Sequence, residues 1–348
     1  MDFRHLFNAP RKMKLAGLFL ALVIGLTGAV PLQASEVNIY SHRQQFLLQP
    51  FLDAFTAETG IKTNVVYASK GLAQRLQAEG KASPADVILT VDIARLSEYA
   101  DLDLLAPVES DILNANIPPH LRAKDNRWFA FSTRTRVAVT SKDRVADGAI
   151  KDIEDLANPE WQGRLCARKG SHVYNRSLMA SVIAAHGEEL ATKWGSSIVG
   201  NMVRRPQGND RAQAKAIFEG QCDVAIMNHY YYGKMLHGEK ADHRDWANAI
   251  RLVFTNQDNR GAHMNISGGG LAIHSPNRDA AVAFLEFLTK EKAQQLYGEV
   301  NFEYPVNPLV PAGGVLQSFG DFKRDELNIE KLAELAPAAQ KIINIIGW

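Results

Sequence analysis

The sequence places three tyrosines side by side, Tyr230, Tyr231 and Tyr232, where a buried-strand pattern gives way to a predicted helix. A strand places aromatic side chains on alternate residues, and a helix core spaces them three or four residues apart. Three in a row suit neither pattern, so we expect part of the cluster to face a cleft. A deprotonated phenol is a hard oxygen donor, and the N-terminus of a helix favours negative charge. The run is consistent with a metal-binding or anion-linked site, and also with one core phenol beside two at a wet surface.

Further polar side chains follow other predicted strands. Residues 40–43, 90–92 and 169–174 each come directly after a predicted strand, as the tyrosines do. Ligands of open α/β sheets bind at the carboxyl ends of the strands. This shared placement favours a cleft position for the tyrosines over the surface alternative.

Strands and helices alternate along the chain after its first 36 residues. The first half contains predicted strands at 37–40, 64–67 and 86–89, with helices at 47–58, 72–79 and from Asp92 onward. A second unit starts near Arg136, with strands at 137–140, 164–167, 223–227 and 252–254, and helices at 150–157, 177–186, 188–195 and 211–219. A loop at 267–270 leads into a strand ending at 273, and helices follow at 280–288 and within 330–346. The repeated β-α pattern predicts a mostly parallel sheet covered by helices.

The first 34 residues have the layout of a secretory signal peptide. Arg11, Lys12 and Lys14 precede an apolar run at 15–30, and cleavage is expected after Ala34. An uncleaved membrane anchor is the alternative, although the run is short for a transmembrane helix. No second apolar run approaches spanning length, so we expect a soluble protein exported to the periplasm.

Removing residues 1–34 changes the charge balance. Four basic residues and one acidic residue leave, so 39 Lys+Arg and 38 Asp+Glu become 35 and 37, a net charge of −2. There is then no basic excess to bind nucleic acid and no polybasic patch for lipid. The remaining length exceeds one typical hydrophobic core, which predicts two lobes.

Cys166 and Cys222 are the two cysteines of the chain, and both lie in or beside predicted strands. In an oxidising compartment they either pair or remain two buried thiols, and the sequence does not give their separation in space. No Cys-x-x-Cys motif and no zinc-type spacing of histidine and cysteine occurs.

Residues 268–270 are three consecutive glycines. A phosphate-binding loop would continue with Gly-Lys-Ser or Gly-Lys-Thr, and neither follows here. Close packing of the backbone is the better interpretation of these glycines.

Seven stretches of the chain together match the pattern of one known family: residues 37–43, 127–131, 171–178, 206–211, 228–231, 265–270 and 303–308. Through them the chain from residue 35 onward resembles the ferric-iron-binding periplasmic proteins of ABC importers. The resemblance implies an α/β, two-lobed periplasmic binding protein of type II, each lobe a mostly parallel sheet flanked by helices, with a hinge and an interlobe cleft. We expect lobe 1 at 35–135 plus about 255–310, lobe 2 at 136–254, and C-terminal helices at 311–348 packed on the lobes.

The resemblance also implies a set of metal ligands. In the family an adjacent pair of tyrosines binds the metal, and a third tyrosine comes from a separate segment. By position these are Tyr230, Tyr231 and Tyr174, with Tyr232 outside the pair. Fe³⁺ is a small, hard ion that prefers anionic oxygen donors. A bound cation holds phenolates at neutral pH, so binding should release protons and acid should weaken it.

The first loop departs from the family pattern. Gln44 and Gln45 stand where the family often has a histidine and a tyrosine. His42 would supply a nitrogen ligand instead, or it is a solvated loop histidine. Because Gln44 and Gln45 are unsuitable as strong ferric ligands, we expect the three tyrosines to be completed by His42, water or a small anion such as carbonate.

Three more residues are candidates for contacting an anion or supporting the metal ligands. Arg136 suits a planar anion such as carbonate, or a phenolate, and its alternative is a salt bridge. Asp92 is a candidate acceptor beside the site, or simply a helix N-cap. His229 adjoins the tyrosine pair, and its alternative is a structural role.

Three classes of function compete. The first is a receptor that captures Fe(III) and delivers it to an inner-membrane ABC permease. The second is a receptor for another solute, such as an oxyanion, a polyamine or a phosphorylated organic ligand, which leaves the tyrosine cluster unexplained. The third is an exported enzyme, for which the sequence has no nucleophile elbow, paired-carboxylate site or zinc motif. We favour the first class, a soluble periplasmic monomer that is not an enzyme.

Overall fold

The computed structural model describes residues 36–348, so the predicted signal peptide at 1–34 lies outside the described residues. Within residues 36–348, no helix combines the length and the apolar character needed to cross a membrane.

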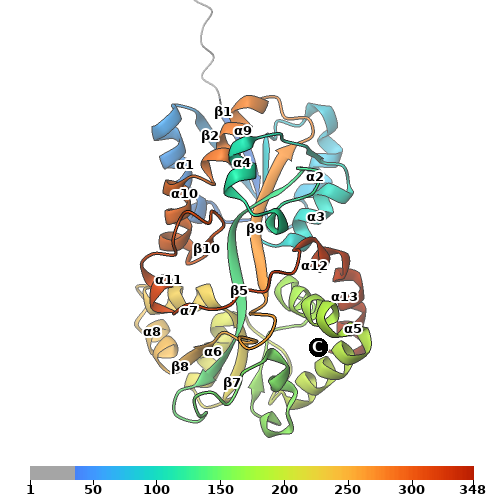
Figure 1. The fold of residues 1–348 in the computed structure, drawn as a ribbon, viewed down its shortest axis with the longest axis vertical. Coiled ribbons are helices and arrows are strands. Elements are labelled where there is room, and N and C mark those ends of the chain that lie inside the picture. Colours follow the sequence, from blue (N-terminus) through green and yellow to red (C-terminus); the bar gives the residue numbers. More distant parts are fainter. Residues whose placement is uncertain (1–35) are drawn as a thin grey trace, which may run out of the picture. The chain divides into compact units, whose positions relative to one another are not determined.

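Strand β5 (Phe129–Ser141) is buried at every residue and links two groups of strands. Its first half pairs with β9 (Met264–Ala272) and β10 (Tyr304–Pro305). Its second half pairs with β7 (Val224–Asn228) and β8 (Ile250–Val253). All four pairings are antiparallel, and Figure 1 shows β5 and β9 running side by side between the two groups of helices. The strand order β2-β1-β3-β9-β5-β7-β6 therefore passes through β5 from one group to the other.

The first group confirms the predicted β-α alternation. The strands β1 (Glu36–Ser41), β2 (Lys62–Tyr67) and β3 (Val87–Thr90) are parallel, and β4 (Leu105–Ala106) pairs antiparallel with β9. Their helices are α1 (Gln45–Thr59), α2 (Leu72–Glu79), α3 (Ile93–Asp101), α4 (Asp111–Asn116), α9 (Arg278–Phe287) and α10 (Glu291–Leu296). Helix α1 buries Leu48, Phe51, Leu52 and Phe55, the spacing of one helix face, and ends where Gly60 takes a left-handed conformation.

The second group carries the segments that hold the tyrosines. Strand β6 (Leu165–Cys166) is parallel to β7, and the helices are α5 (Val173–Asn201), α6 (Asp210–Phe218), α7 (His229–Leu236) and α8 (Ala241–Asn248). The two helices predicted around Gly187 are confirmed, because α5 is interrupted by a kink where Gly187 has a non-helical φ of 80°. The predicted change from strand to helix before the tyrosines occurs at Asn228.

The C-terminal part adds α11 (Val315–Ser318), α12 (Glu330–Glu334) and α13 (Ala336–Ile346). The sequence pattern within 330–346 predicted one helix, and the structure has two. Helix α13 lies beside α5 in Figure 1 and contacts it. The residue bounds expected for the two lobes stay a prediction.

Glycines 268–270 lie inside β9, so the loop predicted there is wrong. The prediction of close backbone packing is confirmed. A Cβ on Gly268 would lie 2.5 Å from the Phe129 carbonyl oxygen, and one on Gly269 would collide with that of Ile88. Only glycine lets the neighbouring strands approach β9 this closely.

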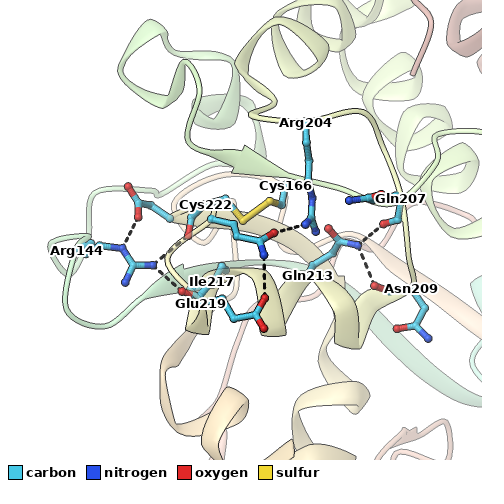
Figure 2. Close-up of a disulfide and its surroundings, with 11 residues drawn as sticks. Arg144, Cys166, Arg204, Gln207, Asn209, Gln213, Ile217, Glu219 and Cys222 are labelled. Carbon is cyan, nitrogen blue, oxygen red and sulfur yellow. Dashed lines mark hydrogen bonds and ion pairs between the residues drawn. A yellow bond between two sulfur atoms is a disulfide. The ribbon is translucent and has the colours of Figure 1, made fainter.

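Cys166 and Cys222 form a disulfide, with their Cα atoms 6.0 Å apart (Figure 2). It joins β6 to the segment that leads into β7, the two strands that precede Tyr174 and the tyrosine pair. Arg144 donates to the carbonyl oxygen of Cys222 at 3.1 Å and so fixes the same turn. The disulfide therefore ties together the strands that position the tyrosine segments.

Replacing both cysteines with alanine is expected to lower the free energy of unfolding by about 4 kcal/mol, because the bond closes a loop with a sequence separation of 56 residues. Urea denaturation without reductant measures the loss. Reductant should shift the wild-type transition and leave that of the double variant unchanged. A double variant as stable as the wild type would contradict the expectation.

Candidate metal centre

A cavity of about 720 Å³ gathers side chains from both groups of strands. The site residues predicted from the sequence that line it are His42, Tyr174, Tyr230 and Tyr231. The other polar residues of its lining are Arg43, Gln44, Tyr67, Arg95, Arg134, His172, Arg211, Lys234, His237 and Glu303. The cavity therefore joins the loop after β1, the start of α5 and the start of α7.

The three tyrosines expected as ligands meet in this cavity. The Tyr230 hydroxyl donates to that of Tyr174 at 3.1 Å, and the rings of Tyr230 and Tyr231 have centroids 4.5 Å apart. Asn228, the N-cap residue of α7, donates its side-chain amide to the Tyr230 hydroxyl at 3.2 Å. Tyr232 points elsewhere, packs on Phe319 with ring centroids 5.5 Å apart, and does not line the cavity.

Both tyrosine segments begin helices. Tyr174 is the second residue of α5, and its backbone N–H donates to the imidazole of His172, the N-cap residue, at 3.3 Å. Tyr230 and Tyr231 are the second and third residues of α7. The partial positive charge of each helix N-terminus favours an anionic phenolate over a neutral phenol.

Cationic side chains surround these phenols. The guanidinium groups of Arg134, Arg136 and Arg168 lie 5.5, 6.0 and 5.4 Å from the centroid of the Tyr174 ring. Arg211 lies 4.9 Å from the Tyr231 ring, and the Lys234 ammonium 5.5 Å from the Tyr230 ring. The rings of all three tyrosines therefore lie against positively charged side chains.

Burial opposes deprotonation while no metal is bound. It raises the pKa of Tyr230 well above its ordinary value, and the neighbouring phenols Tyr174 and Tyr231 raise it further. Burial and Tyr174 likewise raise the pKa of Tyr231 to about 12. Both phenols are therefore neutral at pH 7, and only a strongly charged ion can displace their protons.

His42 is half-buried and bonded through both ring nitrogens. Its Nδ1–H donates to the Ala68 carbonyl oxygen at 2.9 Å, and its Nε2 lies 2.8 Å from the Tyr99 hydroxyl. Burial and the charge of Arg95 lower the pKa of His42, so the ring is neutral. A ligand role would require Nε2 to release Tyr99, and that role stays a prediction.

Arg136 is buried in the core beneath the tyrosines and does not line the cavity. It pairs with Asp210 at 3.1 Å and donates to the side-chain oxygens of Asn175 at 2.7 Å and Asn228 at 2.9 Å. Asn175 follows Tyr174, and Asn228 bonds to Tyr230. Arg136 thus holds the residues next to the tyrosines, and Arg134 is the arginine of β5 that faces the cavity.

Asp92 and His229 are also buried and absent from the cavity lining. Asp92 caps α3 by accepting the Ala94 N–H at 2.9 Å, which is one of the two roles considered for it. The His229 ring stacks on that of Tyr304 with centroids 4.8 Å apart, and burial lowers its pKa to about 4. His229 is therefore neutral and packed behind the tyrosine pair.

Sequence reasoning missed the ion pair of Arg43 with Glu303, whose atoms are 2.8 Å apart at the cavity wall. Ser132 and Ser267 donate to the same carboxylate. Burial alone would raise the pKa of Glu303, but Arg43, together with Arg134 and the Ser132 hydroxyl, outweighs it and holds the pKa at about 2. Both partners lie in stretches that carried the family resemblance, which was the available signal.

Trp348 was also missed, and no sequence signal marked it. Its indole N–H donates to the Arg168 carbonyl oxygen at 3.1 Å, and its own carbonyl oxygen accepts the Gly170 N–H at 3.3 Å. A Cβ on Gly170 would lie 2.6 Å from the indole ring. Trp348 therefore holds the loop that leads into Tyr174.

The fold and this cavity define the class of protein. Two groups of strands joined by β5 and β9, with a ligand-sized cavity at their helix starts, make a two-lobed type II periplasmic binding protein. The chain belongs to the bacterial extracellular solute-binding protein family, whose model matches residues 40–295. Members of this family bind solutes and are not enzymes.

Similar proteins include several named for iron. Iron uptake protein A1 of Synechocystis is 41% identical over 91% of this chain and 89% of its own length. The Trichodesmium protein IdiA (FutA), solved in complex with iron and citrate ligands, has a TM-score of 0.87 and 40% identity, covering 90% of this chain and 100% of that one. Ferric iron-binding protein A of Mannheimia haemolytica, in an open conformation, has a TM-score of 0.86 and 44% identity, covering 90% and 99%.

Glu303→Gln tests the buried ion pair through its pH dependence. A carboxylate whose pKa falls from an ordinary 4.5 to about 2 stabilises the fold above pH 4.5, and this contribution is lost as pH falls toward 2. The lowered pKa corresponds to about 3 kcal/mol of unfolding free energy. In urea unfolding of the metal-free protein, the difference in unfolding free energy between wild type and variant should therefore be about 2 kcal/mol smaller at pH 3 than at pH 6.

Glu188→Gln, on the exposed surface of α5, is the matched control for removing a carboxylate and should cost little stability. A stability difference for Glu303→Gln that stays constant over this pH range would contradict the assignment.

Proposed function

We propose that this chain is the periplasmic receptor of an iron(III) ABC importer, with Fe(III) as its cargo. The observation that carries the proposal is that three phenols, Tyr174, Tyr230 and Tyr231, line one cavity, with the Tyr230 hydroxyl bonded to that of Tyr174 and the Tyr231 ring against the Tyr230 ring. Within residues 36–348, no cluster of three or more His, Cys, Asp or Glu side chains is placed to hold a metal. Phenolates are hard anionic donors, which Fe³⁺ prefers.

The charges of the site fit this cargo. Three phenolates neutralise the three charges of the ion, and their protons leave as it binds. His42 and water are the remaining candidate ligands. The names and contents of the similar proteins support the same cargo, since one is an iron uptake protein and another was solved with iron and citrate.

A small anion would complete the coordination. Arg136 is engaged with Asp210, so we assign the anion contact to Arg134, which lines the cavity. Arg134 Nη2 is buried without a hydrogen-bond partner among the described residues, and the nearest carboxylate oxygen, of Asp92, is 3.8 Å away. A guanidinium suits the planar carbonate ion, and citrate, found with iron in the Trichodesmium protein, is the second candidate.

Binding is coupled to closure of the lobes in this proposal. Residues 35–135 with about 255–310 form one lobe and residues 136–254 the other, with the cavity between them. Iron favours the closed state because only there do groups from both lobes reach it. The leader at 1–34 directs the chain to the periplasm, where the closed monomer is recognised by the inner-membrane permease.

Tyr230→Phe and Tyr231→Phe are each expected to weaken Fe(III) binding by roughly a hundredfold or more, the upper end of the loss seen when a group supporting a metal ligand is removed. Titrating the metal-free protein with ferric citrate should give a broad tyrosinate-to-iron charge-transfer band that saturates at one iron per protein. The band should be lost or displaced in both variants.

Tyr232→Phe is the matched control, because Tyr232 lies on the same helix but packs away from the cavity. It should keep the wild-type band and affinity. A folded wild type that gives no band with Fe(III) would refute the proposal and favour another solute.

A further inference from the structure

Helix α7 carries a glycine, Gly233, one turn after Tyr230. A Cβ at this position would lie 2.7 Å from Cδ1 and 2.8 Å from Cγ of Phe302. The Phe302 ring therefore lies directly on the helix backbone. It also stacks on His237, one turn further along, with centroids 6.0 Å apart and an angle of 19°. Glycine inside a helix is less stable than alanine, so the reason for a glycine here is that a side chain would collide with the Phe302 ring.

Phe302 itself has an unfavourable backbone conformation. Its φ of 56° and ψ of 35° are left-handed, at the end of a π-helical turn, Tyr297–Asn301. Glycine or asparagine normally ends a helix in this way, because the Cβ of other residues is crowded there. A glycine inside a helix, Gly233, and a phenylalanine with left-handed backbone, Phe302, are each locally unfavourable, and the two are in contact. Such conflicts with local preference are typical of functional sites.

The segment that carries Phe302 is firmly anchored on its other side. Arg43 Nη2 donates to both carboxylate oxygens of the next residue, Glu303, at 2.8 Å. Arg43 in turn follows His42 in the loop after β1. Phe302 therefore spans the cavity wall between this loop and α7, and its ring cannot simply follow a shift of the helix.

We propose that Phe302, seated on Gly233, is a positioning residue that sets where the Tyr230 and Tyr231 phenols stand in the cavity. Both tyrosines precede Gly233 by one turn or less on an eight-residue helix, so a displacement of Gly233 moves both phenols. Phe302 needs no contact with the ion to act in this way. The inference rests on the proposed iron site. It adds the contact that fixes the position of α7 relative to the segment that Arg43 anchors through Glu303.

The test combines Gly233→Ala, Phe302→Ala and the double variant in one titration with Fe(III). Gly233→Ala should raise the Kd by about tenfold to a hundredfold, because its methyl group collides with the ring and displaces the helix. The charge-transfer band should shift as well, since the geometry of the phenolates changes. The double variant should have the same Kd and band as Phe302→Ala, because without the ring the added methyl group causes no collision.

Gly200→Ala is the matched control, since Gly200 lies in α5 and a Cβ added to it would meet no atom within 4 Å. It should leave the Kd and the band unchanged. Urea unfolding of each metal-free variant separates site geometry from stability, because a merely structural contact would change unfolding without moving the band. If Gly233→Ala does not fold, Phe302→Ala alone, which introduces no collision, should still raise the Kd and move the band.

The outcomes separate the two proposals. A wild type without a band refutes the iron site itself. A wild type with a band, together with a Gly233→Ala protein of unchanged Kd and band, overturns the positioning role of Phe302. A double variant whose Kd stays above that of Phe302→Ala also overturns it, because the collision with the ring is then not the cause.

Discussion

The ion pair between Arg136 and Asp210, buried at the centre of the molecule, is the interaction on which the site depends. Arg136 stands on β5 where that strand passes from one group of strands to the other. Its guanidinium reaches Asn175 at the start of α5, Asp210 at the start of α6 and Asn228 at the start of α7. Asp210 also accepts the Asn228 N–H at 3.0 Å and pairs with Arg168 at 3.1 Å. One charged network therefore fixes the first turns of three helices.

Such a network is stable only when all its members are satisfied, because each unpaired charge in the core carries a large desolvation cost. Burial would raise the pKa of Asp210, but Arg136 and Arg168 lower it below its ordinary value, so the carboxylate stays charged. The arrangement solves a geometric problem of the site. Neighbouring residues of a helix differ by about 100° in direction, so one helix cannot aim three phenols at one point. The Arg136 guanidinium binds the starts of both α5 and α7, and so brings phenols from two helices together.

The sequence predicted the helices and strands better than it predicted which side chains contact one another. Apolar spacing indicated α1, and the tyrosine run at a strand end indicated the start of α7, because these signals are local. The ion pair of Arg136 joins residues 74 apart, so periodicity could not separate it from an anion contact. The same reason hid the bond between His42 and Tyr99, 57 residues apart. The glycine run in β9 predicts a loop from sequence alone, because its place in a strand depends on the close approach of neighbouring backbones.

The preference of the proposed site for one metal ion depends on its lack of free carboxylates as well as on its phenols. Among the described residues that line it, Glu303 is the only carboxylate, and Arg43 holds both of its oxygens. Negative charge must therefore come from phenols whose protons burial retains. In the proposed iron site, an ion binds only if its attraction for three phenolates exceeds the free energy of removing their protons at neutral pH. A trivalent hard ion meets this condition far more easily than a divalent one. In the proposed iron site, the raised pKa of Tyr230 and Tyr231 thus favours Fe(III) over divalent ions, without any carboxylate ligand.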